Sequence, residues 1–192
     1  MEELQLKCDC GKVTGIVHDV KPGCGNRVVC YCASCRNFAK HVNPDGHVLN
    51  EFGGTEIFQI APSSMEIQQG LDSIACLRLS EKGLYRWYAS CCNTPIGNTV
   101  SLRFPLVGVI SSFITRDQGV DSKIGPVVGI SYEQYATGDL PQSMRIGKSK
   151  IAQLFTMIRK MLIWKVQGKH SPSPFYDKQG NPIVEPSIIK RP

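Results

Sequence analysis

Cysteine content constrains this chain more than any other feature, since nine of its 192 residues are cysteines. The count is odd, and residues 1–8 have neither the basic start nor the apolar core of a secretory signal, so we expect an intracellular, cytoplasmic protein. A reducing cytosol disfavours disulfides. Metal thiolates are therefore the first explanation to test for so many cysteines.

The composition is that of a folded domain with an uneven charge. Hydrophobic residues make up 42% and charged residues 20%, which excludes an intrinsically disordered chain. Apolar runs last only a few residues, far fewer than the roughly 20 that cross a bilayer. The net charge is +6, and the segment 148–169 holds Lys and Arg but no Asp or Glu. Because the excess charge is local, no specific nucleic acid is expected as a partner.

Residues 4–115 are predicted to form a mainly β domain. Short β-branched or alternating apolar segments are separated there by turn residues, as in an antiparallel sheet. The turn at 80–83, with its glycine, predicts a hairpin. The expected strands are 4–8, 13–17, 27–30, 57–60, 73–79, 84–89 and 106–113.

Residues 116–192 are predicted to form a helical C-terminal extension. A capping box at 131–134 predicts a short helix that Gly138 ends. Apolar residues recur at helical spacing over about 149–167, which predicts a basic amphipathic helix, and a Pro-rich tail follows at 171–192. We expect the apolar stripe of this helix to pack on the β domain with its lysines in water. The alternatives are a peripheral membrane contact and a contact with a partner protein or a nucleic acid.

A triplet of cysteines gives the strongest local signal for a metal site. Cys30 and Cys32 project from one face of a strand, and a turn through 33–34 returns Cys35 to that face. Zinc accepts such thiolates in a tetrahedron. The next cysteine, Cys76, is far along the chain, so the fourth position stays open, as in a catalytic zinc site. The alternative is three buried thiols packed as small apolar groups.

A second group of cysteines predicts a structural site. Cys8 and Cys10 again place two sulfurs on one face, and Gly11 allows the backbone to turn beneath a metal. Two ligands cannot fill a tetrahedron, and Cys91 and Cys92 beyond the predicted hairpin are the natural source of the others. A metal-free cluster of thiols is the alternative. Two cysteines remain outside both groups: Cys24 and Cys76.

The order of these motifs resembles the glutathione-dependent formaldehyde-activating enzyme family, and within it an uncharacterised branch. The motifs are Cys-x-Cys-Gly, then Cys-x-Cys-x-x-Cys-Arg, then Cys-Asn-Thr-Pro-Ile, and the resemblance covers about residues 4–115. It implies a Mss4-like zinc-binding β-sheet domain. It also implies a carbon–sulfur lyase of the S-(hydroxymethyl)glutathione synthase type, in which a catalytic zinc binds the glutathione sulfur while formaldehyde is added.

The resemblance assigns roles to individual cysteines. Cys30, Cys32 and Cys35 fall on the catalytic zinc positions. The positions of the structural zinc are taken by Cys8, Cys10 and Cys92. One position departs from the pattern, because Ala89 stands where the first cysteine of the later pair is expected. Cys91 replaces it only if the backbone is kinked, since adjacent residues on a regular strand face opposite ways.

Three thiolates around Zn²⁺ leave a site of net charge −1, which suits deprotonation of an incoming thiol better than polarisation of a carbonyl. We therefore expect addition of a zinc-activated small thiol, glutathione or similar, to an aldehyde such as formaldehyde. Arg36 follows the last ligand and is the candidate for electrostatic support, whereas Lys40 and His41 are more often solvated surface charges. The alternative function is a non-catalytic zinc-fold binding module, membrane-peripheral through the basic helix.

Overall fold

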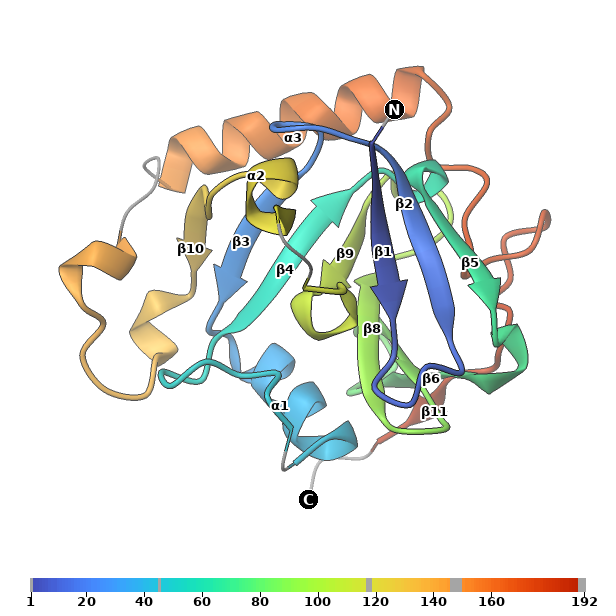
Figure 1. Ribbon diagram of the computed structural model, residues 1–192, viewed down its shortest axis with the longest axis horizontal. Helices are drawn as coiled ribbons and strands as arrows, with labels where there is room; N and C mark the ends of the chain where they lie inside the picture. The colour runs from blue at the N-terminus through green and yellow to red at the C-terminus, as the bar shows by residue number, and fades with distance from the viewer. Residues whose placement is uncertain (1, 45, 117–118, 146–149, 190–192) are drawn as a thin grey trace.

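The structure is a computed structural model that describes residues 2–44, 46–116, 119–145 and 150–189. Its strands form two sheets (Figure 1). The smaller sheet has the order β1-β2-β5, and the larger has the order β10-β3-β4-β9-β8-β7-β6-β11. This architecture confirms the prediction of a mainly β protein with a helical C-terminal extension.

The described strands are short, as the sequence predicts. They are β1 Glu2–Lys7, β2 Thr14–Val20, β3 Asn26–Cys30, β4 Thr55–Ile60, β5 Met65–Gln69, β6 Ile74–Arg78, β7 Tyr85–Ala89, β8 Thr94–Thr99, β9 Val107–Ile110, β10 Gly129–Ser131 and β11 Ser187–Ile188. β6 and β7 pair antiparallel, which confirms the predicted hairpin. The last two strands come from the C-terminal part of the chain and pair in parallel with β3 and β6, at the two edges of the larger sheet. The division of the chain at residue 115 stays a prediction.

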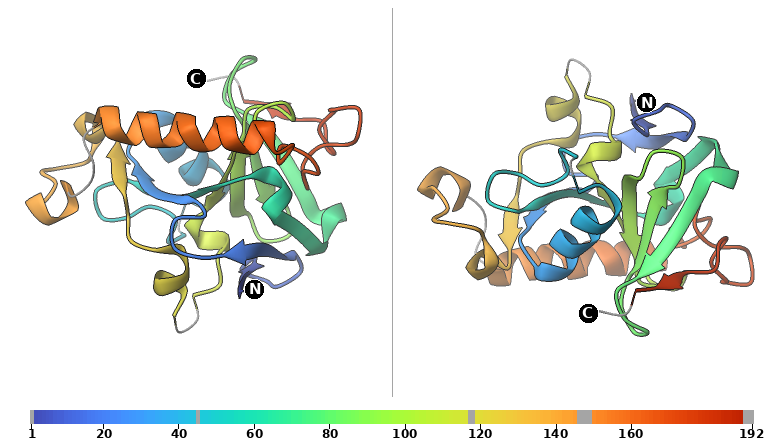
Figure 2. Two further views of the ribbon diagram at one scale, coloured as in Figure 1. Left: turned by 90° about the horizontal axis from the view of Figure 1, so that it is seen from above. Right: turned by 90° about the horizontal axis from the view of Figure 1, so that it is seen from below.

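Three α-helices accompany the sheets in the described residues: α1 Ala33–Val42, α2 Val120–Ile124 and α3 Lys150–Val166. The short 3-10 helices are η1 Pro62–Ser64, η2 Leu71–Ser73, η3 Ser111–Phe113, η4 Glu133–Tyr135 and η5 Gln142–Arg145. α3 runs along one side of the molecule, and α1 lies on the opposite side (Figures 1 and 2). In the described part of the chain, no helix has both the length and the apolar character that crossing a bilayer requires.

Two local predictions differ from the structure. The segment after Cys32 is not a simple turn but the ten-residue helix α1, whose buried residues Cys35, Phe38, Ala39 and Val42 have helical spacing. The capping box at 131–134 opens only the single-turn helix η4, and its N-cap is Tyr132, which has a positive φ of 59°.

The core lies between the two sheets and extends to the C-terminal tail. The side chain of Trp87 in β7 is fully buried, and its ring stacks on that of Phe175 with 4.7 Å between centroids. The hydroxyl of Tyr176 lies 2.7 Å from that of Thr99 in β8. The tail therefore fills part of the core instead of only covering it.

The face of α3 that meets the domain corrects the predicted orientation of this helix. Ala152, Gln153, Thr156 and Met157 are half-buried, and Trp164 is buried. The large apolar residues of the predicted stripe point outward instead: Ile151, Leu154, Phe155, Ile158 and Leu162 are exposed. The inner face is mixed in polarity, and Gln153, Thr156 and Met157 on it line a cavity between α3 and the domain.

Candidate metal centres

Three cysteine sulfurs meet where β3 passes into α1. Cys30 ends the strand, Cys32 is the N-cap of the helix, and Cys35 lies in its first turn. Their Sγ atoms all lie within 4.8 Å of one another. The backbone N–H of Cys35 donates to Cys32 Sγ at 3.4 Å, so a sulfur caps the helix. A helix N-terminus favours negative charge, and this cap therefore stabilises a thiolate.

The three thiols of this group share their protons unequally. Hydrogen bonds from Cys30 and then Cys35 lower the pKa of the Cys32 thiol to about 2, and the charge of Arg86 acts in the same direction. Hydrogen bonding to Cys32 and Cys35, together with burial, raises the pKa of Cys30. Hydrogen bonding within the group and the charge of Arg86 therefore favour the thiolate form of Cys32.

A buried guanidinium stands beside these sulfurs. Arg86 in β7 is only 2% exposed, and its Nη1 donates to Cys35 Sγ at 3.6 Å and to Asn98 Oδ1 at 2.8 Å. Its Nη2 donates to Ser34 Oγ at 2.7 Å. Within the described ranges, no salt bridge joins Arg86 to a carboxylate. A buried charge needs a counter-charge, and the clustered sulfurs supply it.

Arg36, the residue predicted to support the site, hydrogen-bonds to neighbouring loops. Its guanidinium donates to the carbonyl of Gly53 at 3.4 Å and to the carbonyl of Tyr135. Lys40 and His41 are exposed in the last turn of α1. The guanidinium within hydrogen-bonding distance of a sulfur is that of Arg86, which sequence reasoning missed.

The group of three sulfurs opens into a cavity of about 490 Å³. Polar atoms come from Ser34, Arg86 and Asn98, and two tyrosines stand in its wall. The remaining lining is mostly apolar: Val28, Ile57, Leu84, Val100 and Leu106. A small molecule in this cavity can reach the three sulfurs while apolar side chains limit its contact with water.

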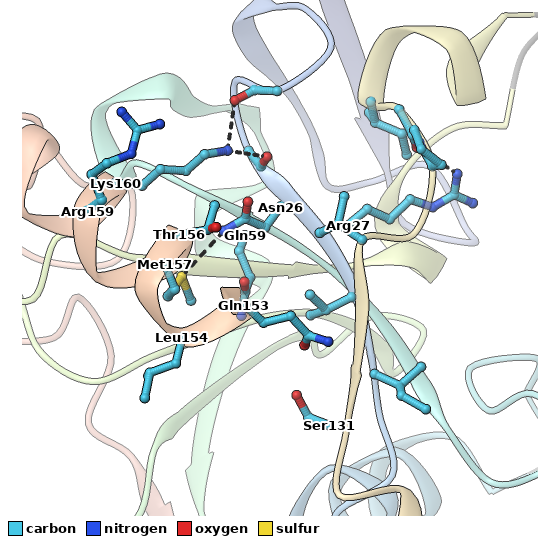
Figure 3. A pocket seen from close by; sticks show the side chains of 18 of the residues that line it. Asn26, Arg27, Gln59, Ser131, Gln153, Leu154, Thr156, Met157, Arg159 and Lys160 are labelled. Atoms are coloured by element: carbon cyan, nitrogen blue, oxygen red, sulfur yellow. Dashed lines mark hydrogen bonds between the residues drawn. The ribbon is translucent and has the colours of Figure 1, made fainter. Parts of the chain in front are cut away.

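A larger cavity of about 650 Å³ adjoins the first, between α3 and the edge formed by β3 and β10 (Figure 3). Amide and hydroxyl side chains line it, among them Asn26, Gln134, Gln153 and Thr156. Four residues border both cavities: Val28, Gln59, Ser131 and Tyr132. The two cavities are therefore adjacent, with these side chains between them.

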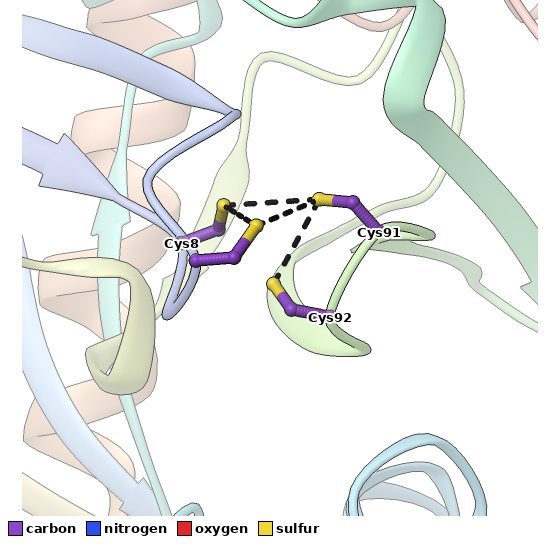
Figure 4. Close-up of side chains that lie close together, drawn as sticks. Cys8, Cys91 and Cys92 are labelled. Atoms are coloured by element: carbon purple, nitrogen blue, oxygen red, sulfur yellow. Dashed lines mark hydrogen bonds between the residues drawn. The ribbon is translucent and has the colours of Figure 1, made fainter.

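Four further cysteines form a second group between the β1–β2 turn and the turn after β7 (Figure 4). The Sγ atoms of Cys8, Cys10, Cys91 and Cys92 all lie within 4.8 Å of one another. The shortest separation is 3.2 Å, between Cys10 and Cys91. Four sulfurs in this arrangement are the ligand set of a closed, tetrahedral thiolate site.

A tight turn supplies the kink that Cys91 needs. The backbone N–H groups of Cys92 and Asn93 both point to the carbonyl of Ala89, at 3.4 and 2.7 Å, and Asn93 has a positive φ of 59°. Because the chain leaves the strand here, Cys91 and Cys92 face the same way and meet the first pair.

The thiols of Cys91 and Cys92, which are adjacent in sequence, have pKa values shifted in opposite directions. Burial opposes ionisation of Cys92, but hydrogen bonds from Thr94 and from the backbone of Cys10 outweigh it and lower its pKa to about 6. Local desolvation of the otherwise exposed Cys91, together with its hydrogen bonds with Cys10 and Cys92, raises the pKa of its thiol to about 12. Cys24 and Cys76 belong to neither group of clustered metal-binding side chains in the described residues.

The fold and these two groups define a mainly β protein with two sulfur sites that could hold a metal ion. The chain belongs to the family of unknown function DUF6151, whose model matches residues 2–187. No curated protein matches it. Among solved structures, the chain is similar to a Rhodobacter sphaeroides protein from a structural genomics programme, with 15% identity over 61% of this chain and 93% of that chain and a TM-score of 0.41.

Proposed function

We propose that this protein is a zinc-dependent enzyme that adds a small thiol, glutathione or similar, to an aldehyde such as formaldehyde. One observation carries the proposal: Cys30, Cys32 and Cys35 converge in the wall of a cavity, beside the buried cation of Arg86. The motif resemblance to the formaldehyde-activating enzymes supports the same reaction. Nine free thiols further favour a reducing, cytoplasmic location.

The two sulfur groups fit zinc in different ways. Cys8, Cys10, Cys91 and Cys92 offer four soft ligands and would hold a closed, structural ion. The other group offers three ligands and borders a cavity, which is typical of a catalytic ion. When bound there, zinc would supply deprotonation of a substrate thiol.

The reaction joins the thiol sulfur to the aldehyde carbon. The sulfur supplies the electron pair of the new bond, the carbonyl π pair moves to oxygen, and the proton lost from the thiol ends on that oxygen. No oxidant is consumed, and the product is a hydroxymethyl thioether when the aldehyde is formaldehyde. The apolar part of the cavity wall would reduce the contact of the bound aldehyde with water, which otherwise hydrates it.

Two polar residues have defined roles in this proposal. Arg86 balances the negative charge of the three sulfurs and, through Ser34 at the start of α1, fixes them relative to β7. Asn98 lines the cavity, and its Oδ1 accepts from Arg86. The amide Nδ2 of Asn98 is therefore the donor for an aldehyde oxygen as that oxygen gains charge.

The proposal is tested by NMR with ¹³C-formaldehyde and glutathione, and then with other low-molecular-weight thiols. Zinc-loaded protein should accelerate exchange between the free aldehyde and its hydroxymethyl adduct. Cys32→Ser should abolish the acceleration, whereas Cys24→Ser, outside both groups, should retain it. If zinc binds at both groups but no thiol is accelerated, the protein is a non-catalytic zinc-fold module and the proposal is wrong.

A further inference from the structure

Helix α3 lies on the outside of the molecule (Figure 2). Its exposed side chains include a row of large apolar residues. The exposed fraction is 77% for Ile151, 75% for Phe155, 61% for Leu162 and 89% for Val166. Soluble proteins rarely expose contiguous apolar surface of this kind, and such patches mark contacts with partners or membranes. Leu154 borders the larger cavity, whereas the other exposed apolar residues of α3 line neither of the two cavities described above.

Two basic residues of α3, Arg159 and Lys165, flank this apolar stripe. At 100° per residue, exposed Arg159 and Lys165 fall on opposite sides of the line through Phe155 and Leu162. The sequence from 148 to 169 holds six Lys or Arg and no Asp or Glu. Two neighbouring loops, whose carbonyls accept from Lys160 and Lys165, contribute the further exposed cations Lys21 and Arg103.

We propose that α3 binds the surface of an anionic lipid bilayer, with its apolar stripe in the headgroup region and its cations on lipid phosphates. Apolar side chains flanked by Lys and Arg are the pattern of helices that lie in the plane of a membrane interface. The other side of α3 packs on the domain through Trp164 and through hydrogen bonds of Lys160 to the carbonyls of Gly23 and Gly25. The helix would therefore act as a fixed docking edge.

Charge favours this occupant over a second copy of the chain. Arg159 is next to the midpoint of the helix, so a twofold pairing of two α3 helices would bring the two Arg159 side chains together. No acidic side chain within 148–169 can offset them. An anionic surface attracts the same charges instead.

The test is co-sedimentation of the full chain with phosphatidylcholine vesicles, with and without phosphatidylglycerol. We expect binding to the anionic vesicles in low salt and release in high salt. Phe155→Asp with Leu162→Asp should abolish binding, and Arg159→Glu should weaken it about fivefold or more. The matched control is Leu71→Asp, an exposed apolar residue outside α3, which should bind like the wild type.

Circular dichroism and the thermal midpoint establish that each variant is folded. If the wild type does not bind anionic vesicles, this result alone overturns the proposal, whatever the variants do. Equal binding to neutral and anionic vesicles overturns the role of charge. The wild type could instead be a dimer that binds no vesicles and that becomes a monomer in the Phe155→Asp, Leu162→Asp variant. That result would assign the apolar face to self-association and would also overturn the proposal.

Discussion

The guanidinium of Arg86 donates to the sulfur of Cys35 at 3.6 Å, although β7 and the start of α1 are far apart in the sequence. The side chain of Arg86 is a guanidinium cation. Burying this cation without a nearby anion would carry a large desolvation cost. A buried cluster of thiolates without the guanidinium would carry a desolvation cost of the same kind. The cation and the three sulfurs depend on each other.

Replacing Arg86 by Met should weaken metal binding at Cys30, Cys32 and Cys35. Removal of one partner of a buried charge pair costs about 3–5 kcal/mol, which appears as lower metal affinity, lower stability, or both. Arg86→Lys keeps the charge but loses the forked contacts to Asn98 and Ser34. Its zinc affinity and stability should therefore lie between those of the wild type and those of Arg86→Met. The measurement is competition with a zinc chelator together with urea unfolding.

A matched control for this change is Arg78→Met, because Arg78 packs on the ring of Tyr85, away from the sulfurs. It should leave zinc affinity unchanged. Wild-type zinc affinity in Arg86→Met would contradict the charge balance described here.

Substitutions in the two cysteine groups should have different effects: one group should matter for stability and the other for ligand binding. Cys8→Ala should unfold or strongly destabilise the protein, because a structural zinc contributes about 10–16 kcal/mol, comparable with the whole stability of a domain. Cys32→Ala should remain folded and lose one zinc with any thiol binding. Metal analysis and thermal unfolding measure both effects, with Cys24→Ala as the control that changes neither. Equal stability of the Cys8 and Cys32 variants would contradict this division.

Glu56 is predicted to stabilise the fold only above mildly acidic pH. Burial opposes its ionisation, but hydrogen bonds from Arg27 and Arg116, at 2.9 and 2.8 Å, outweigh this and lower its pKa. A carboxyl whose folded pKa lies below the unfolded value of about 4.3 stabilises the fold above that value and loses its contribution as pH falls through the folded pKa. Glu56→Gln should therefore cost about 1.5–3 kcal/mol at pH 7.

Urea unfolding as a function of pH checks this prediction. The difference between wild type and Glu56→Gln should shrink as the pH falls below 4.3, the approximate unfolded value. Exposed Glu81→Gln is the control and should show no such difference. A gap that stays constant into acid would mean that the ionised carboxylate is not what stabilises the contact.

The tail is predicted to be an integral part of the core. Phe175 is fully buried against Trp87, and Phe→Ala at such a position costs about 3–5 kcal/mol. Phe175→Ala should therefore shift the urea midpoint strongly, whereas Val166→Ala, at an 89% exposed residue, should shift it little. Similar midpoints for the two variants would show that the tail does not support the core.

Local spacing predicted much of the fold and of the site. Alternation along short segments located β1–β4, β6, β7 and β9 but missed β5, β8, β10 and β11. The spacing of Cys30, Cys32 and Cys35 brought three sulfurs together because these residues are neighbours in sequence. Helix α1 was missed although Cys35, Phe38 and Val42 carry its spacing. That apolar pattern was the signal that could have located it.

Contacts between residues far apart in the sequence could not be predicted from local sequence patterns. Arg86 reads as an ordinary polar position in a strand, and only the packing of β7 against α1 brings it to a sulfur. Cys91 needed a turn at Asn93 that strand alternation argues against. The stripe of α3 was predicted correctly in spacing but not in direction, since periodicity gives a helix two faces without telling which one meets the protein.

The most direct measurement for this account is anomalous diffraction at the zinc absorption edge from crystals of the zinc-loaded protein. We predict a peak among Cys30, Cys32 and Cys35, with three sulfurs at about 2.3 Å and the fourth position facing the cavity without a protein ligand. A fourth protein side chain on that zinc, or the lack of any peak among these sulfurs, would contradict the account.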